Sequence, residues 1–277
     1  MQHSYQWWFT RGTASAAMSF LLALTPALMP SGAMAETTPR PLDLDVPFVP
    51  TRTEVVSRML EMAQVGESDF LVDLGSGDGR IPVAAVRDFK ARGAFGVDID
   101  PQRVSEARAN AEQAGVSDKV SFEVQDLFDT DLAQATVLSM YLLPDVNLKL
   151  RPVILDLAPG TRVVSHDFSM GDWKSDQFDE VGNSSIYLWI VPAKADGAWQ
   201  VQGPDGDFAL DLTQTFQLLE GQASGQGTVS GQLRGADIQF DIEQGGAVQR
   251  YIGRVQGDSM VAVDASGAVP GWRATRR

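Results

Sequence analysis

The stretch Asp73-Leu74-Gly75-Ser76-Gly77-Asp78-Gly79-Arg80 decides the fold of this 277-residue chain. The apolar run Phe70-Leu71-Val72 precedes it, and helix-compatible sequence follows from Ile81 onward. This order predicts a strand, a glycine turn and a helix. We expect the turn to leave backbone N–H groups free near a helix N-terminus, where they would hold a polar cofactor, and its glycines to let that cofactor approach closely.

The spacing of the glycines indicates which cofactor is bound. They follow the pattern G-x-G-x-G with Asp73 two residues upstream, whereas the dinucleotide fingerprint reads G-x-G-x-x-G. The difference favours S-adenosylmethionine (SAM) over NAD. We therefore expect Asp73, Gly75, Ser76 and Gly77 to contact SAM.

A second acidic position lies about 20 residues beyond the turn. Ala94-Phe95-Gly96-Val97-Asp98 is typical of a buried strand that ends in a carboxylate, and such a carboxylate binds ribose hydroxyls. Asp98 is the predicted ribose ligand, with Ile99 beside it in the cofactor site. Asp100 precedes Pro101, so we interpret it as the N-cap of a helix that ends near Gly115.

The third predicted strand is Val120-Ser121-Phe122-Glu123-Val124, in which apolar and polar residues alternate. It leads into a loop that starts with Gln125 and Asp126, at the same edge of the sheet. A carboxylate at that place accepts a hydrogen bond from an adenine amino group. Asp126 and Leu127 therefore complete the predicted cofactor site.

With DLGSGDGR at 73–80, GVDID at 96–100 and VQDLF at 124–128, the chain resembles the class I SAM-dependent methyltransferases over about residues 45–192. Pro47-Phe48-Val49-Pro50-Thr51 together with DLGSGDGRI also resembles the small protein-lysine methyltransferases of the ATP synthase c subunit and the adenine nucleotide translocase. The resemblance implies a Rossmann-like α/β fold with a seven-stranded sheet, mostly parallel with one late antiparallel strand. In that family, the positions that correspond to Asp73, Gly75, Gly77 and Asp98 bind SAM, and Glu is frequent where this chain has Asp98.

Thr51 has two interpretations. Thr51-Arg52-Thr53-Glu54 forms a capping box, and Val55, Val56, Met59, Leu60 and Ala63 share one face of the helix that it would open. The family resemblance places this segment over the amino-acid end of the cofactor. Thr51 is therefore either a cap alone or a cap that also contacts SAM.

The fourth predicted strand, 136–141, ends in Tyr141, our candidate catalytic residue. The D/N-P-P-Y signature is absent after it, which argues against amino-purine or amide methylation and fits a lysine enzyme with an apolar, aromatic channel. Tyr141 would hold the cationic acceptor, and a buried aromatic at a strand end is the alternative. Asp145 is predicted to cap the next helix, with a kink at Pro152.

His166 falls late in the predicted strand 161–168 and is the only histidine beyond residue 35. Packing within the strand is its default interpretation, and a role on the substrate side is the alternative. We expect the loop 169–173 to cover the pocket, and residues 185–191 to form the late antiparallel strand.

The charge of the chain limits its partners. Asp and Glu outnumber Lys and Arg by 36 to 22, which gives a net charge of −14. Such a field repels phosphate backbones and attracts cationic targets, so we predict no nucleic-acid partner. The absence of cysteine excludes disulfides, Cys-ligated zinc and cysteine nucleophiles, and no metal site is predicted.

The first 35 residues have the pattern of a secretory signal peptide: one basic residue, an apolar run over 14–29, and the small-x-small sequence Ala33-Met34-Ala35. We expect cleavage before Glu36 and a lead-in segment over 36–50. Export would place the protein in the periplasm or outside the cell. An uncleaved signal that anchors the chain in the membrane is the lesser alternative.

Composition changes after the methyltransferase segment, 51–192. Residues 197–277 contain no lysine, are rich in glycine and alternate as short strands. Gly231-x-Leu233-x-Gly235 recurs as Gly253-x-Val255-x-Gly257, and we expect two hairpins with turns at 235–237 and 257–259. The prediction is a small all-β antiparallel domain, either a meander or a half-barrel, that serves for packing or for docking.

Two functional hypotheses follow. The leading one is an exported SAM-dependent methyltransferase that acts on protein lysine or on a small molecule. The alternative is a catalytically inactive methyltransferase fold that binds a nucleoside-like ligand or a partner in the cell envelope. Charged SAM does not cross a membrane unaided, so an exported enzyme needs a separate supply of it.

Overall fold

The structure is a computed structural model that describes residues 49–277. The predicted signal peptide and residues 36–48 of the predicted lead-in lie outside this range. Within it, no helix combines the length and the apolar character that a bilayer span requires.

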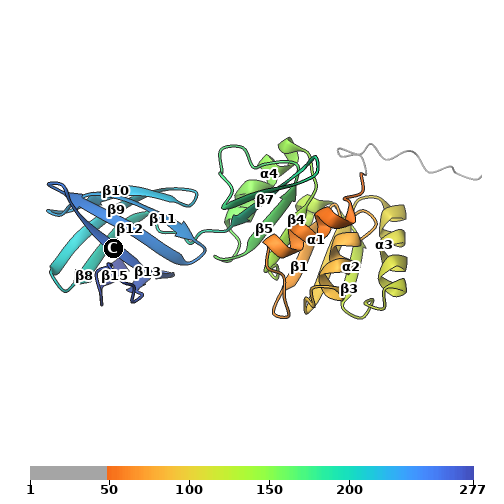
Figure 1. The fold of residues 1–277 in the computed structure, drawn as a ribbon, viewed down its shortest axis with the longest axis horizontal. Helices are drawn as coiled ribbons and strands as arrows, with labels where there is room; N and C mark the ends of the chain where they lie inside the picture. Colours follow the sequence, from red (N-terminus) through yellow and green to blue (C-terminus); the bar gives the residue numbers. More distant parts are fainter. Residues whose placement is uncertain (1–48) are drawn as a thin grey trace, which may run out of the picture. The chain divides into compact units, whose positions relative to one another are not determined.

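Residues 53–190 form an α/β domain in which strands and helices alternate as far as residue 166 (Figure 1). The helices are α1 (Thr53–Met62), α2 (Arg80–Arg87), α3 (Pro101–Gln113), the short 3₁₀ turn η1 (Leu127–Asp129) and α4 (Pro144–Leu155). The strands are β1 (Phe70–Leu74), β2 (Gly93–Asp98), β3 (Val120–Val124), β4 (Val137–Met140), β5 (Arg162–His166), β6 (Gln177–Val181) and β7 (Ser184–Ile190).

The seven strands pair in the order β3-β2-β1-β4-β5-β7-β6. β1 to β5 are parallel, whereas β7 pairs antiparallel with both β5 and β6. The expected sheet with one late antiparallel strand is therefore confirmed; the edge strand β6 was not foreseen. The chain leaves β1 toward β2 on one side and returns to β4 on the other, so the carboxyl ends of β1 and β4 flank a switch point, where ligands bind in open α/β sheets.

Both faces of the sheet are covered because successive strand residues point to opposite sides. Leu71 of β1 belongs to the core that α1, α2 and α3 build on one face. Its neighbour Val72 belongs to the second core, which α4 builds on the other face. Near-continuous apolar strands such as β1 and β4 follow from this double coverage.

Helix starts differ in part from the prediction. Asp100 caps α3 as expected, since its carboxylate accepts a hydrogen bond from the Gln102 N–H. The Thr51 cap is wrong: Arg52 occupies the N-cap of α1, and the Thr51 hydroxyl has a buried partner elsewhere. The Asp145 cap is also wrong, because α4 begins at Pro144 and Leu143 takes the N-cap position. Asp145 lies in the first turn instead.

Residues 197–276 form a closed barrel of eight antiparallel strands. They are β8 (Gly197–Gly203), β9 (Gly206–Thr215), β10 (Leu218–Ala223), β11 (Gly227–Arg234), β12 (Asp237–Gln244), β13 (Ala247–Gln256), β14 (Ser259–Ala262) and β15 (Arg273–Arg276). Each strand pairs with the next, and β15 pairs with β8. The antiparallel β domain and both hairpins are confirmed; the open meander or half-barrel becomes a closed ring, which leaves no unpaired edge.

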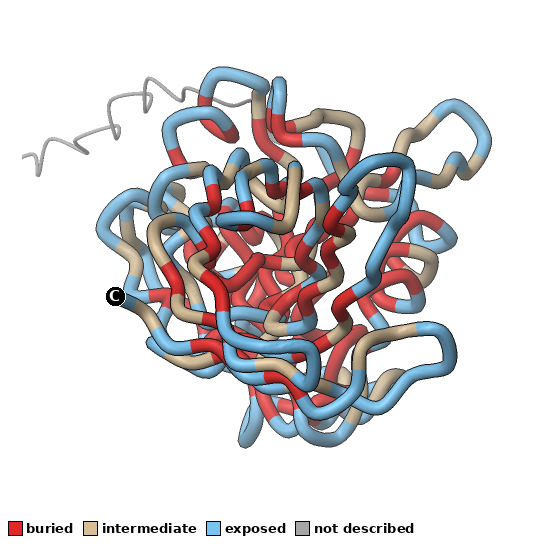
Figure 2. Tube along the Cα trace, turned by 90° about the vertical axis from the view of Figure 1, so that its left-hand side faces the viewer, coloured by how far each residue is buried: buried red, intermediate tan, exposed pale blue. Residues whose placement is uncertain are grey.

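Aromatic side chains fill the barrel. Phe240 stacks on Tyr251 with ring centroids 4.8 Å apart, and Trp272 meets Phe240 edge-on at 5.5 Å. Gly231 makes room for this packing, because a Cβ there would lie 2.6 Å from the Phe240 Cβ. Buried and exposed positions alternate along the strands, as the burial colours of Figure 2 show.

Candidate functional site

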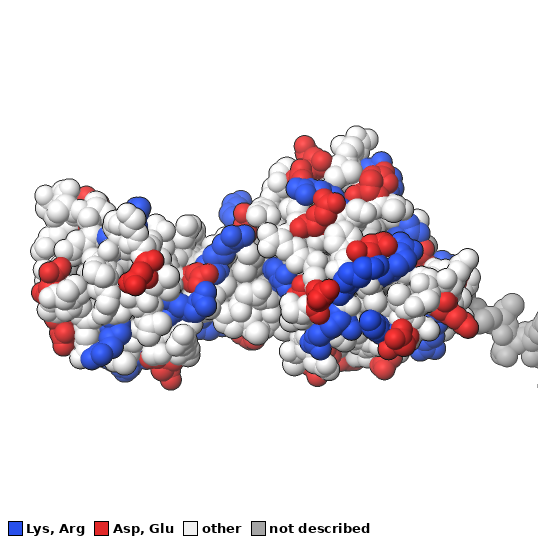
Figure 3. Space-filling view, turned by 60° about the horizontal axis from the view of Figure 1, so that its bottom comes forward, with Lys and Arg blue, Asp and Glu red and all other residues white. Residues whose placement is uncertain are grey.

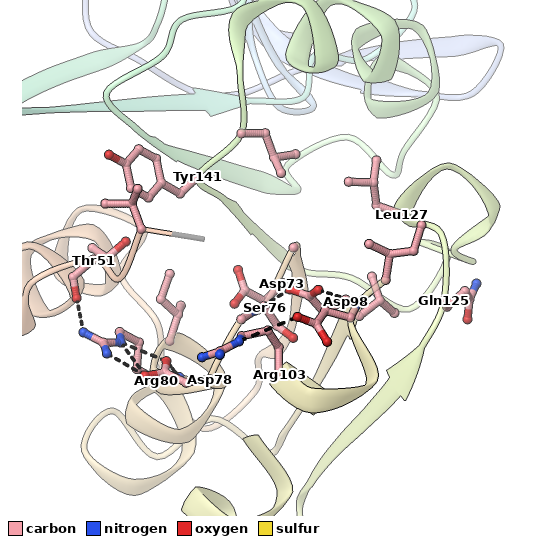
Figure 4. Close-up of a pocket in the computed structure, with 18 of the residues that line it drawn as sticks. Thr51, Asp73, Ser76, Asp78, Arg80, Asp98, Arg103, Gln125, Leu127 and Tyr141 are labelled. Carbon is pink, nitrogen blue, oxygen red and sulfur yellow. Dashed lines mark hydrogen bonds and ion pairs between the residues drawn. The ribbon is translucent and has the colours of Figure 1, made fainter. Parts of the chain in front are cut away.

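A cavity opens at the carboxyl edge of the sheet, beside the switch point (Figure 4). It encloses about 1150 Å³, counted with its open mouth. The residues that the sequence predicts for the site all line it: Thr51, Asp73, Gly75, Ser76, Gly77, Asp98, Ile99, Asp126, Leu127 and Tyr141. The fold therefore brings together, in one place, side chains from five separate loops.

The glycine turn corrects one expectation. The N–H groups of Gly75 and Ser76 both donate to the Val97 carbonyl, and the Gly79 N–H donates to the Ser76 carbonyl. These groups hold the turn in shape and are not free for a ligand. Gly75 adopts φ +73°, where a Cβ would meet the Leu142 side chain at 3.0 Å, so this position requires glycine.

Asp98 organises the turn as well as the cavity wall. One carboxylate oxygen accepts a hydrogen bond from the Gly77 N–H at 2.8 Å, and the other accepts from the Asp100 N–H at 2.9 Å. Each carboxylate oxygen has a second lone pair for a ligand hydroxyl. Asp98 thus ties β2 to the glycine turn and still presents acceptors to the cavity.

Asp73 is the most buried acid of the site, at 2 % exposure. Removal from water, with a smaller contribution from the nearby Asp98 and Asp78 carboxylates, raises the pKa of its carboxyl to about 7. The Ser139 hydroxyl opposes this effect by donating a hydrogen bond at 2.7 Å. A carboxyl in this state favours a positively charged ligand, whose charge would stabilise the ionised form.

A pair of residues that sequence reasoning left without a role lies at the mouth of the glycine turn. The Arg80 guanidinium forms an ion pair with Asp78 at 2.5 Å and donates to the Thr51 carbonyl at 2.7 Å (Figure 4). Arg80 therefore fastens the segment before α1 against the glycine turn. A sequence pattern could have indicated this ion pair, because the acid Asp78 and the base Arg80 stand on either side of Gly79, the last glycine of the stretch 73–80.

The opposite wall of the cavity is apolar. Ile99 and Phe128 are 47 % and 44 % exposed, unusually high for large apolar side chains, and Leu127 also lines the cavity. Asp126 stands at the same wall, where its carboxylate caps η1 by accepting from the Phe128 N–H. An apolar wall with one carboxylate at its edge suits a flat heterocycle that carries an amino group.

The other end of the cavity is formed by Tyr141, just after β4. Its ring packs on the His166 ring with centroids 3.9 Å apart, and its hydroxyl donates to the Asp167 carboxylate at 3.2 Å. His166 is buried and its Nδ1 lies 3.1 Å from the Thr51 hydroxyl. Burial lowers the pKa of His166, so it is neutral at pH 7. The loop 169–173 does not line the cavity; Met170 and Trp173 are buried in the second core.

These residues fit SAM. The Ser76 hydroxyl is buried in the cavity wall with no partner among the described residues, as expected for a group that awaits a ligand. Asp98 would hold the ribose, Asp126 with the apolar wall the adenine, and Asp73 with Thr51 the charged amino-acid end. Within residues 49–277, no cluster of His, Asp or Glu has the arrangement of a metal site.

Known proteins share the α/β domain. The family model of the ANTKMT methyltransferase domain matches residues 73–177. A protein-lysine N-methyltransferase from Saccharolobus islandicus is 43% identical over 151 residues, which are 53% of this chain and 94% of that protein. The mouse adenine nucleotide translocase lysine N-methyltransferase is 34% identical over 158 residues, 57% of this chain and 67% of that protein.

A solved structure has a related fold and contains a form of the cofactor. It is described as an RNA methyltransferase from Salinibacter ruber in complex with S-adenosyl-L-homocysteine (SAH). It is 52% identical to this chain, covers 53% of it and 95% of its own length, and superposes with a TM-score of 0.52. SAH is the product that SAM leaves after it gives up its methyl group, so this relative supports SAM as the cofactor of the cavity.

Proposed function

Because the chain belongs to the family of SAM-dependent protein-lysine methyltransferases, we propose that it transfers the methyl group of SAM to lysine side chains of a protein. One observation carries the proposal. The cavity that fits SAM ends at Tyr141, where aromatic rings and a carboxylate lie together. That combination suits a cationic amine, which a carboxylate attracts and aromatic rings contact favourably.

The chemistry divides between cofactor and protein. SAM supplies a methyl group on a sulfonium, and transfer forms an N–C bond while the S–C electron pair stays on sulfur. The lysine must first release its ammonium proton to water, because only the neutral amine has a lone pair. The apolar side chains of Leu142 and Val146, which also line the cavity, favour that neutral form, and the chain's main task is to align the amine and exclude water.

RNA is the competing acceptor, since the Salinibacter ruber structure is described as an RNA methyltransferase. Electrostatics disfavours it here. Five aspartates line the cavity against two arginines, and both arginines form ion pairs with acids. On the face shown in Figure 3, basic side chains are interspersed with acidic ones instead of forming a continuous basic surface. A polyanion needs such a surface.

The discriminating experiment offers both acceptors to the purified protein. It is incubated with SAM labelled in the methyl group, together with poly-L-lysine, with denatured lysate protein, or with total RNA. We expect label in the two protein fractions, recovered as methyllysine after hydrolysis, and none in RNA. The variant Asp98→Ala is the blank. Label in RNA alone, or in neither acceptor, contradicts the proposal.

We further propose that residues 1–35 direct the protein out of the cytoplasm. The proposal is supported by the order of basic residue, apolar run and small-x-small site in the sequence. A fusion of residues 1–40 to a reporter that is active only outside the cytoplasm is expected to be active. A stable but inactive fusion contradicts export.

A further inference from the structure

Asp167, the residue that follows β5, has an unusual backbone. Its φ is +61°, in the left-handed region that non-glycine residues seldom adopt. Two hydrogen bonds to one residue of β7 hold it there: its N–H donates to the Ser185 carbonyl at 2.7 Å, and its Oδ1 accepts from the Ser185 N–H at 2.9 Å. The two hydrogen bonds fix the direction of the Asp167 side chain.

The loop after Asp167 is fastened from inside the domain. The buried Asn147 of α4 and Ser165 of β5 both donate hydrogen bonds to the Phe168 carbonyl, at 3.1 and 2.8 Å. The ring of Phe168 lies 6.2 Å from that of Tyr141. The carboxylate and the rings around it are therefore fixed before any ligand arrives.

The second carboxylate oxygen of Asp167 is poorly satisfied. Among the described residues, Oδ2 accepts only a long hydrogen bond, at 3.2 Å, from the Tyr141 hydroxyl. The His166 Nε2 lies 3.4 Å from Oδ2 but makes no hydrogen bond to it. Within residues 49–277, no Lys or Arg forms an ion pair with Asp167, and its side chain is 28 % exposed. A carboxylate oxygen in this setting has the capacity to accept from a strong donor.

We propose that the Asp167 carboxylate, which contacts the Tyr141 hydroxyl at the end of the cavity, binds the ammonium group of the incoming acceptor lysine. The inference rests on the proposed lysine methylation and adds the residue that selects a cation. A carboxylate favours the charged amine, whereas methyl transfer needs the neutral one. Asp167 therefore acts in capturing the acceptor, and the amine leaves it when its proton is lost to water.

The test is Asp167→Asn, because Asn also tolerates the left-handed conformation and keeps the hydrogen bond to Ser185. We expect KM for poly-L-lysine to rise about tenfold or more, from the loss of a charge-assisted hydrogen bond, while kcat stays within about twofold. SAH affinity and the unfolding temperature should match those of the wild type. Asp145→Asn removes the same charge from an exposed position in the first turn of α4 and should change neither constant.

A binding measurement separates this inference from the proposed function. n-Butylammonium, a mimic of the lysine side chain, is titrated into the SAH-saturated wild type and variant, with 1-pentanol as the neutral control. We expect n-butylammonium to bind the wild type and to bind the variant about tenfold or more weakly. Equal binding to both proteins, or an unchanged KM in the variant, overturns the role of Asp167. Asp167-dependent amine binding by a wild type that does not methylate lysine refutes the proposed function alone.

Discussion

The α/β domain and the barrel bury different kinds of side chain. Every buried polar or charged side chain among residues 49–277 lies in the α/β domain: Thr51, Asp69, Asp73, Ser76, Ser139, Asn147, Thr161, Ser165 and His166. The buried side chains of the barrel are aliphatic or aromatic. Buried polarity costs free energy unless it is satisfied, so a domain retains it where it serves a purpose. Several of these polar groups border the cavity.

The two domains also differ in how they use glycine. In the turn after β1, positive φ values shape a cavity wall; in the barrel, Gly231 and Gly253 let neighbouring backbone and rings approach. A Cβ at Gly253 would lie 2.6 Å from the Trp272 ring. The parallel sheet leaves a crevice at its switch point, whereas the closed barrel uses its interior for packing.

This difference predicts that a core substitution in the barrel lowers stability without changing cofactor binding in the α/β domain. Phe240→Ala removes a fully buried ring and should lower the free energy of unfolding of the barrel by about 3 to 5 kcal/mol. The dissociation constant for SAH should not change, because the cavity is lined by residues 49–146 only. Denaturation followed by circular dichroism, and calorimetry with SAH, measure the two quantities. Val261→Ala, partly exposed on β14, is the control.

A loss of SAH affinity that accompanies the loss of barrel stability would contradict the independence of the two domains. It would mean that the two domains form one cooperative unit.

Burial of the Asp73 carboxyl should lower the free energy of unfolding at neutral pH. The folded carboxyl of Asp73 keeps its proton up to about pH 7, whereas the unfolded one loses it near 3.8. The free energy of unfolding therefore falls as pH rises from about 4 to about 7, by up to about 4 kcal/mol. Asp73→Asn should lack this slope and be more stable than the wild type at pH 8.

Urea denaturation of ligand-free protein at several pH values measures the slope. Asp118→Asn, at an exposed position, should retain it. Parallel pH profiles for the wild type and Asp73→Asn would show that burial of this acid is not what costs stability.

Asp98→Ala should affect binding more than folding. It removes two hydrogen bonds to backbone N–H groups and the predicted ribose acceptor, so SAH affinity should fall by about a hundredfold. Glu123→Ala, exposed on the neighbouring strand β3, should bind SAH normally. Calorimetry measures the SAH affinity of both variants. An affinity of Asp98→Ala within threefold of the wild type would exclude Asp98 from the cofactor site.

The smallest effect concerns Asp100, which also lines the cavity but whose carboxylate caps α3. Asp100→Ala removes the N-cap of α3 and should lower stability by about 1 kcal/mol without changing SAH affinity. Glu112→Ala, exposed on the same helix, provides the baseline. If Asp100→Ala weakened SAH binding as much as Asp98→Ala, the division of roles between these two acids would be wrong.

The sequence predicted the sheet and the cavity wall well because both depend on local patterns. Asp73 and Asp98 lie near the ends of β1 and β2, Asp126 follows β3, and parallel strands bring their carboxyl ends to one edge. The Thr51 cap failed because a tertiary contact with His166, 115 residues away, took the hydroxyl. The role proposed for Asp167 could not be predicted either, since no local sequence pattern indicates its left-handed backbone conformation. Closure of the barrel depends on pairing between β8 and β15, which are far apart in sequence.

The pairing of β8 with β15 also determines when, during synthesis, the chain no longer exposes a strand edge that could pair with other chains. The sheet has all its strands once Ile190 has been added, and N-terminal domains fold as units while translation continues. β8 has only one neighbour until Arg273–Arg276 has been made. Over that interval the nascent barrel exposes an unpaired strand edge. The four residues of β15 therefore decide when the growing chain stops being a template for pairing with other chains.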